Sequence, residues 1–287
     1  NQWHAHTYYT HLFRNSKKVE LNGRYTHHAI YDETIKFIKD SKDKPFFLYC
    51  PWTPPHSAYQ IPEDEPAWKI YKDKKWNKDA KVVAAMDTMM DRQVGEITAL
   101  PKKLGIYQNT LMFFTSDNGA AKRFDGIHNS CGVMQGHKRS LNEGGIRVPM
   151  VVRWPGKIKP GTESNQPWYF PDVMPTLAEI AGVSKEVPKD IDGISVLPSL
   201  LGKGEQKQHE YMYWQFGVRA VRSGKWKGIG KGGHLYLYDL TKDMAEKNDL
   251  SAKHPEIAAK LKTYITEGYR EPRSQKDDGK YTGKAKK

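Results

Sequence analysis

The stretch that decides the fold is residues 110–119, TLMFFTSDNG, where an apolar run stops abruptly at Ser, Asp, Asn and Gly. A short, continuous apolar run is typical of a strand buried on both faces. Residues 45–51 (PFFLYCP) and 148–155 (VPMVVRWP) have the same character. We therefore predict three buried strands, each followed by polar or proline-rich chain.

Helical patterns lie between and after these strands. Residues 79–104 carry apolar side chains at steps of three and four, and Gly105 suits the C-terminal cap. Asp32 can cap a shorter helix, and residues 172–181 predict another. Strands that alternate with helices up to about residue 182 predict an α/β domain with a largely parallel sheet.

The pattern changes after about residue 205. Residues 211–216, 219–229 and 234–240 are short β-like runs separated by Gly or polar turns, and residues 255–269 predict a terminal helix with one apolar side. This arrangement predicts a small antiparallel sheet covered by a helix, as a second unit.

Composition limits the classes of protein to consider. The 287 residues carry 46 Lys and Arg against 33 Asp and Glu, which gives a net charge of +13. Such an excess suits an acidic polysaccharide, a nucleic acid or simply a solvated surface. The lysines are dispersed and no basic helix is interleaved with aromatic residues, so we do not expect a nucleic acid partner. No stretch approaches the roughly 20 apolar residues of a membrane span, and two cysteines make no disulfide scaffold.

Candidate functional residues follow the predicted strands, where α/β sheets bind ligands. Asp117 and Asn118 offer the hard oxygen ligands that Ca²⁺ or Mg²⁺ prefers, although Asp-Asn-Gly is also common in turns. His56 follows two prolines and suits acid chemistry or donation to an anion, or is an ordinary loop histidine. Lys138, flanked by Gly136, suits neutralisation of an anion or is a solvated surface charge.

The order of these motifs resembles the sulfatase family, the formylglycine-dependent branch of the alkaline phosphatase-like superfamily. The resemblance runs from about residue 25 to 268. The matching segments, in the family's order, are residues 46–51 with 55–56, 109–119, 136–138, 143–149, 154–156, 172–177, 192–195, 219–227 and 238–250.

The resemblance implies roles for individual residues. Asp117 and Asn118 match metal ligands, usually for calcium, with Mg²⁺ as the alternative. His56 and Lys138 match catalytic residues that contact the sulfate, and Lys138 also helps the leaving oxygen. Arg219 and His234, with Arg222, are candidates for binding substrate from the C-terminal sheet.

The sequence also departs from the family. Neither Cys50 nor Cys131 begins the Cys-x-Pro-x-Arg motif that is oxidised to formylglycine, and no Ser fits it. The early Asp-Asp metal pair is missing as well. Because these features belong to the front of the family's chain, we expect an N-terminally incomplete sulfatase whose formylglycine comes from an upstream segment. The chain starts at Asn1 without a signal peptide, yet the resemblance implies export to a periplasmic, extracellular or lysosome-like location.

These expectations define an architecture and an activity. Residues 1–204 are expected to form the C-terminal portion of the sulfatase α/β domain, residues 205–272 the small sheet with its helix, and residues 273–287 a disordered tail. The expected reaction is hydrolysis of a sulfate monoester of a carbohydrate or aryl alcohol. The alternatives are a phosphodiesterase or phosphonate hydrolase of the same superfamily, and a non-catalytic module that binds sulfated glycans.

Overall fold

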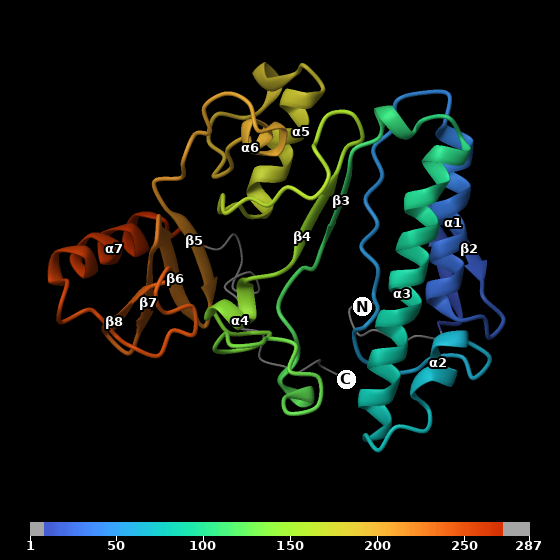
Figure 1. Ribbon diagram of the computed structural model, residues 1–287, viewed down its shortest axis with the longest axis horizontal. Coiled ribbons are helices and arrows are strands. Elements are labelled where there is room, and N and C mark those ends of the chain that lie inside the picture. Colours follow the sequence, from blue (N-terminus) through green and yellow to red (C-terminus); the bar gives the residue numbers. More distant parts are fainter. Residues whose placement is uncertain (1–8, 272–287) are drawn as a thin grey trace. The chain divides into compact units, whose positions relative to one another are not determined.

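The computed structural model describes residues 9–271, which form two compact units divided between Thr110 and Leu111 (Figure 1). The expected disordered tail, residues 273–287, lies outside the described residues. The boundaries expected at residues 204 and 272 stay predictions. The two units are described separately.

The first unit is a hairpin followed by helices. Its elements are β1 His11–Arg14, β2 Lys17–Glu20, α1 Thr26–Ser41, α2 Pro66–Tyr71, α3 Lys78–Lys103 and a 3₁₀ turn, Tyr107–Asn109. Helix α3 confirms the longest predicted helix. The side chain of Asn77 caps its first turn by accepting the Ala80 N–H at 2.9 Å, and Gly105 follows it with φ 74°. Met89 and Ala85 of α3 are buried against the start of α1 and against α2.

Two predictions for this unit are wrong. Residues 45–51 form no strand: the chain is irregular there, and Phe47 and Tyr49 are 70% and 72% exposed. A strand needs a neighbour for its backbone groups, and none of the described strands pairs with this run. Asp32 does not cap a helix, because α1 begins six residues earlier at Thr26 and places Asp32 in its interior, paired with Arg24.

The second unit begins with a pair of strands, β3 Met112–Thr115 and β4 Met150–Arg153. They pair antiparallel, with Phe113 opposite Val152. The prediction of a largely parallel sheet is therefore not met: every strand pair among residues 9–271 is antiparallel. The apolar runs predicted the strands, but the direction of pairing depends on how the intervening chain returns.

Short helices lie between these two strands and after them. They are α4 Glu143–Ile146, α5 Val173–Ile180 and α6 Leu197–Leu201, with 3₁₀ turns at Lys122–Phe124, Phe170–Asp172 and Ser184–Glu186. Helix α5 confirms the helix predicted at residues 172–181.

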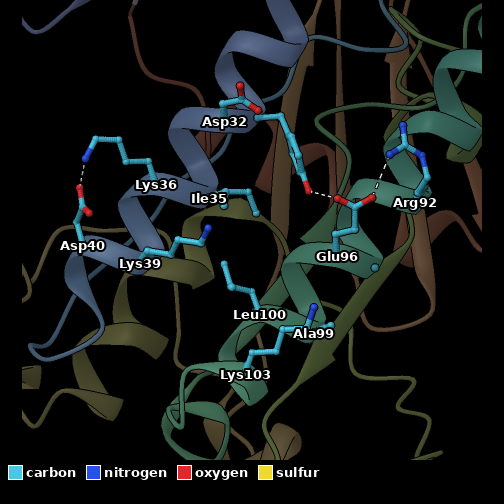
Figure 2. A pocket seen from close by; sticks show the side chains of 12 residues that line it. Asp32, Ile35, Lys36, Lys39, Asp40, Arg92, Glu96, Ala99, Leu100 and Lys103 are labelled. Atoms are coloured by element: carbon cyan, nitrogen blue, oxygen red, sulfur yellow. Dashed lines mark hydrogen bonds and ion pairs between the residues drawn. The ribbon is translucent and has the colours of Figure 1, made fainter. Parts of the chain in front are cut away.

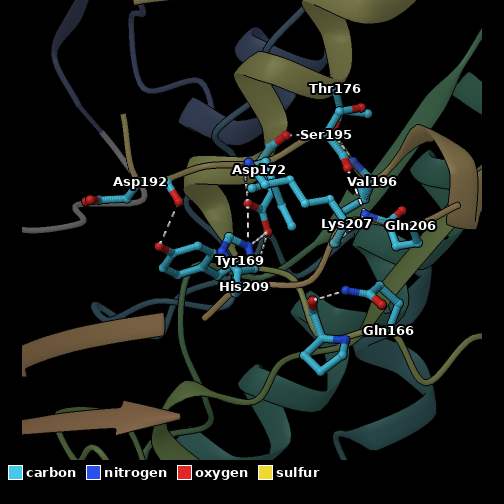
Figure 3. Close-up of polar contacts among 12 residues, drawn as sticks. Gln166, Tyr169, Asp172, Thr176, Asp192, Ser195, Val196, Gln206, Lys207 and His209 are labelled. Atoms are coloured by element: carbon cyan, nitrogen blue, oxygen red, sulfur yellow. Dashed lines mark hydrogen bonds and ion pairs between the residues drawn. The ribbon is translucent and has the colours of Figure 1, made fainter. Parts of the chain in front are cut away.

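Buried polar contacts hold α5 to the chain that leads to the next sheet (Figure 3). The Asp172 carboxylate, fully buried, accepts the N–H groups of Tyr169 at 2.9 Å and Ile194 at 2.8 Å. It also accepts a hydrogen bond from His209 Nε2 at 2.9 Å. Because a buried carboxylate is stable only when it is paired, Asp172 fixes the path of three separated segments.

The C-terminal sheet confirms the predicted small antiparallel sheet with its helix (Figure 1). Its strands are β5 Met212–Phe216, β6 Val218–Ser223, β7 Trp226–Lys231 and β8 His234–Asp239, joined in sequential order, and the helix is α7 Pro255–Glu267. The run predicted at residues 219–229 is thus two strands, divided at a turn.

Both faces of this sheet are covered. Val221, Leu235 and Leu237 pack against Leu261 and Ile265 of α7. On the opposite face, Ala220, Ile229 and Tyr238 pack against Leu141, which precedes α4, and against Ile146, the last residue of α4. Alternate residues of a strand point to opposite faces, so each strand supplies both cores. The sheet therefore lies between α7 and the loop that carries Lys138.

Candidate active site

The Asp117–Asn118 pair lies in the turn that ends β3. Ser116 Oγ donates to the Asn118 carbonyl at 3.0 Å, and Asn118 Nδ2 donates to Asp117 Oδ1 at 2.8 Å. The Asp117 side chain is exposed, and Asn118 is half-buried. The turn thus presents a carboxylate and an amide oxygen side by side at the surface of the second unit.

The structure brings Lys138 to the same turn through backbone contacts. The Lys138 N–H donates to the carbonyl of Ala120 at 2.8 Å, two residues after Asn118. The Gly119 N–H donates to the Gly145 carbonyl at 2.9 Å, and so links the turn to α4. Asp117, Asn118 and Lys138, separated by some twenty residues in sequence, therefore belong to one loop cluster, which we define as residues 116–120 with 135–147.

Glycines make this close packing feasible. A Cβ on Gly119 would lie 1.9 Å from the carbonyl oxygen of Gly144. A Cβ on Gly144 would lie 2.4 Å from the carbonyl oxygen of Gly136, and one on Gly145 would lie 2.1 Å from that of Ser140. Because these distances are far below van der Waals contact, only glycine at these positions lets the backbone of the loop cluster pack this closely.

Lys138 is available to bind an anion. Its side chain is half-buried, and no ion-pair or hydrogen-bond partner for its ammonium occurs among residues 9–271. The next residue, Arg139, has φ 74°, in the left-handed region that is unfavourable for residues other than glycine. A charged group held on an irregular, tightly packed loop is the kind of element that binding and catalytic sites use.

A buried ionic cluster joins the loop cluster to the C-terminal sheet. Lys227 Nζ of β7 lies 2.8 Å from Glu143 Oε1 and 2.9 Å from Glu246 Oε1, and Lys227 is 0% exposed. Glu246 Oε2 accepts the backbone N–H of Glu143 at 2.7 Å. Three ionisable side chains thus meet at the first residue of α4, out of contact with solvent.

The charges of this cluster are unequally stabilised. Burial works to raise the pKa of Glu143, but Lys227, with Arg222 and Arg147, holds that pKa below its ordinary value. Burial raises the pKa of Glu246, because Lys227 compensates it only in part. Arg147 Nη1, 3.4 Å from Glu143 Oε2, adds positive charge at the half-exposed side of the cluster. The cluster therefore has a firmly ionised carboxylate in Glu143 and a weaker acid in Glu246.

Two further candidates from the sequence lie elsewhere in the second unit. The Arg219 guanidinium lies over the ring of Tyr269, 3.8 Å from its centroid, and Arg219 shares the strand face of Val221, which α7 covers. His234 Nε2 lies 2.8 Å from Asp249 Oδ2 at the exposed start of β8. Neither side chain is joined to the loop cluster. Arg222, by contrast, shares the strand face of Ala220, which packs toward α4, and its charge is felt at Glu143.

His56 belongs to the first unit. His56 is exposed, and its backbone N–H donates to the Thr53 carbonyl at 3.0 Å, which closes a turn. His56 Nδ1 lies 2.9 Å from the carbonyl oxygen of Ser57. Ser57 Oγ lies 3.4 Å from the same nitrogen, so both of these polar contacts of Nδ1 are with the next residue in the chain.

The donor chemistry of the Asp117–Asn118 pair fits a hard divalent cation in kind. Ca²⁺ takes six to eight oxygens, of which the pair offers two from adjacent residues. Among residues 9–271 there is no group of three or more His, Cys, Asp or Glu side chains arranged to hold a metal. A cation at this turn therefore stays a prediction.

The cysteines do not fit a formylglycine precursor. Neither has the required motif, as the sequence shows. The Cys50 thiol is half-buried near Thr34 Oγ1, and burial raises its pKa. Cys131 Sγ donates to the Gly144 carbonyl at 3.4 Å. No reaction step is therefore assigned to either residue.

A groove of about 870 Å³ lies between α1 and α3, within the first unit (Figure 2). Several of its charged side chains pair with one another: Glu96 accepts hydrogen bonds from Tyr31 and from Arg92, and Lys36 pairs with Asp40. None of the candidate site residues lines it. Groups that satisfy each other in this way leave little to recognise a ligand.

The comparisons with known proteins place the chain in a family. The sulfatase family profile matches residues 1–183, more than half of the chain, and a profile described as N-sulphoglucosamine sulphohydrolase, C-terminal, matches residues 135–271. The chain belongs to the sulfatase family. Its fold is that of the alkaline phosphatase-like proteins, as the resemblance in the sequence predicted.

Individual relatives agree with this assignment. The chain is 34% identical over 191 residues to steryl-sulfatase of Rattus norvegicus, covering 63% of this chain and 31% of the relative. It is 30% identical over 264 residues to N-acetylgalactosamine-6-O-sulfatase of Bacteroides thetaiotaomicron, covering 81% and 48%. The crystal structure of Ps i-CgsB in complex with k-i-k-neocarrahexaose is 27% identical with a TM-score of 0.75, covering 88% and 56%. The chain thus spans 31% and 48% of the length of these two curated relatives.

The buried ionic cluster is not among the features that we predict from the sequence, where Lys227 falls only within the matching segment 219–227. The sequence does contain a sign of this burial. Side chains of residues 226–229 point alternately to the two faces of a β-strand, so Lys227 shares a face with the apolar Ile229. A lysine in register with a core residue points inward and needs a carboxylate partner. The partners themselves, 84 and 19 residues away, are set by tertiary structure.

No helix in the described part of the chain is long and apolar enough to cross a membrane.

Proposed function

We propose that this protein hydrolyses sulfate monoesters and that the loop cluster carries part of the active site. The observation that supports the proposal most is the convergence of Asp117, Asn118 and the unpaired Lys138 on one tightly packed set of loops in a chain of the sulfatase family. A tetrahedral sulfate carries charge on several oxygens, and a preorganised cation lowers the energy of a transition state in which that charge grows.

Each side chain has a defined part in the proposed reaction. Asp117 and Asn118 would hold Ca²⁺, with Mg²⁺ as the alternative, and the bound ion would supply positive charge to the sulfate oxygens. The Lys138 ammonium would bind a sulfate oxygen and stabilise the departing alcohol oxygen. His56 belongs to the first unit, and the role we propose for it, as the family resemblance implies, is donation of a proton to the departing alcohol oxygen.

The substrate class we propose is a sulfated carbohydrate. The net charge of +13 favours an anionic polymer, and the named relatives include a sulfatase of N-acetylgalactosamine and a structure that holds a neocarrahexaose. Arg222 is better placed than Arg219 or His234 to bind such a substrate, because only Arg222 faces Glu143 of the loop cluster. We also propose that the protein is exported, as the family resemblance implies.

Paired assays test the activity. The protein as its natural host makes it should release sulfate from an aryl sulfate, and release phosphate from the matching aryl phosphate far more slowly. The reverse preference would favour a phosphodiesterase or phosphonate hydrolase. Calorimetric binding of a sulfated glycan without any turnover would favour a binding module instead. Sulfate release from a panel of sulfated oligosaccharides then defines the substrate.

A further inference from the structure

The strongest feature outside the proposed reacting groups is the buried ionic cluster of Lys227, Glu143 and Glu246. Lys227 comes from β7 of the C-terminal sheet, whereas Glu143 begins α4, five residues after Lys138. The two charges lie 2.8 Å apart with both side chains buried. The interaction thus connects the C-terminal sheet to the element that follows Lys138.

We infer that Lys227 is a positioning residue, which fixes the place of Lys138 by holding Glu143 and thereby the loop cluster against the C-terminal sheet. The inference rests on the proposed function for its catalytic meaning. The physical route is short: Lys227 holds the Glu143 side chain, α4 carries Gly144 and Gly145, and their carbonyls and N–H groups bond the segments that bear Asp117 and Lys138.

Two observations show that the link is built rather than incidental. Glu246 has φ 53°, a left-handed conformation that is costly for a residue other than glycine, and its carboxylate accepts the Glu143 N–H at 2.7 Å. Apolar packing of Leu141 and Ile146 on the sheet surrounds the ionic contact on the same face. The strained backbone of Glu246 and the buried charge of Lys227 both bear on Glu143, the first residue of α4.

A hydrophobic residue would join the sheet to the loops without the cost of burying charge. The ionic contacts add geometric specificity. A carboxylate held between a lysine ammonium and a backbone N–H has one favourable position, whereas apolar side chains can pack in several. Catalysis is sensitive to such displacements, since a misplacement of about 1 Å can cost roughly 100-fold in rate. Lys227 is therefore expected to affect turnover more than a purely structural contact would.

The test compares Lys227→Met with the double variant Lys227→Met/Glu246→Gln, which removes one charge of each sign. Lys225→Met is the matched control, because Lys225 is half-exposed and pairs with Asp239 away from α4. Each variant is made in the protein as its natural host makes it. Turnover of an aryl sulfate is measured per folded molecule, and hydrogen exchange is followed in peptides covering residues 135–147.

The double variant should fold and lose about 10- to 100-fold in kcat/KM, with the larger share of the loss in kcat. Its backbone amides at residues 135–147 should exchange at least tenfold faster than those of the control. The exchange rate of α7 should stay unchanged. Wild-type turnover together with wild-type protection from hydrogen exchange in the folded double variant would overturn the inference. A purely structural role predicts that both properties recover once the variant is stably folded. If the wild type itself has no sulfatase activity, the proposed function fails. The exchange measurement then still decides whether Lys227 holds the loop.

Discussion

The strand pair β3–β4 and the sheet β5–β8 are both antiparallel, yet they are covered very differently in the second unit. Val221 of β6 is fully buried between its neighbours and α7, whereas Val151 of β4 is 60% exposed. The four-stranded sheet has a core on each face, while the strand pair ends in the loops that carry Asp117 and Lys138. The difference separates two regions: the C-terminal sheet is packed on both faces, and the end of β3 carries residues of the proposed site.

The largest expected effect is on activity, at Asp117. Asp117→Ala should lower turnover of an aryl sulfate by about 100- to 1,000-fold, because the cation loses an anionic ligand and the sulfate loses electrostatic stabilisation. The exposed position of Asp117 predicts little change in the melting temperature. Kinetics together with metal analysis by mass spectrometry measures both. Full calcium content and wild-type turnover would remove Asp117 from the site.

A methyl group at Gly119 tests whether the packing of the loop cluster supports the chemistry. Gly119→Ala should cost up to about 3 kcal/mol of unfolding free energy and lower turnover, since its Cβ would lie 1.9 Å from the Gly144 carbonyl oxygen. Gly95→Ala is the control, because no atom lies within 4 Å of its Cβ position within α3. That change should raise stability by up to about 1 kcal/mol. Equal behaviour of the two variants in urea unfolding would contradict this account.

Identical truncations in the two sheets test their different burial directly. Val221→Ala should lower the free energy of unfolding by about 2 kcal/mol, from lost transfer energy and a residual cavity. Val151→Ala should change it by less than about 0.5 kcal/mol, because its side chain is mostly in solvent. Urea unfolding of both variants gives the comparison. A large loss at Val151 would mean that the strand pair is covered in the working protein.

The smallest expected effect concerns pH and the C-terminal sheet. The hydrogen bond from Lys225, with help from Thr241, lowers the pKa of Asp239 to about 2. A lowered folded-state pKa stabilises the fold above the unfolded pKa of about 3.9, and this contribution is lost as the pH falls toward 2. Because Lys225 is half-exposed, solvent screening keeps the effect below about 1 kcal/mol. Asp239→Asn should lower the melting temperature slightly at pH 7 and not at pH 2; an equal shift at both would argue against ionisation as the cause.

The sequence predicted the elements better than their partners. The period of residues 79–104 predicts α3, and the runs after residue 205 predict the small sheet with α7, because periodicity reports which side of a segment is apolar. Residues 45–51 carry an equally apolar run and form no strand, since a strand also needs a neighbour to pair with. The antiparallel pairing of β3 and β4 was missed for the same reason: local pattern does not state the direction of a distant partner.

The candidate site divides along the same line. Residue type and position after apolar runs were enough to select Asp117, Asn118, His56 and Lys138 as candidate site residues. Their oxygen ligands, imidazole and ammonium are the groups that bind cations and anions. Only the tertiary structure joined Lys138 to the turn of Asp117, turned Arg219 toward α7 and placed Lys227 between two buried glutamates. Residue type is a local property, whereas contact across more than 80 residues depends on how the whole backbone folds.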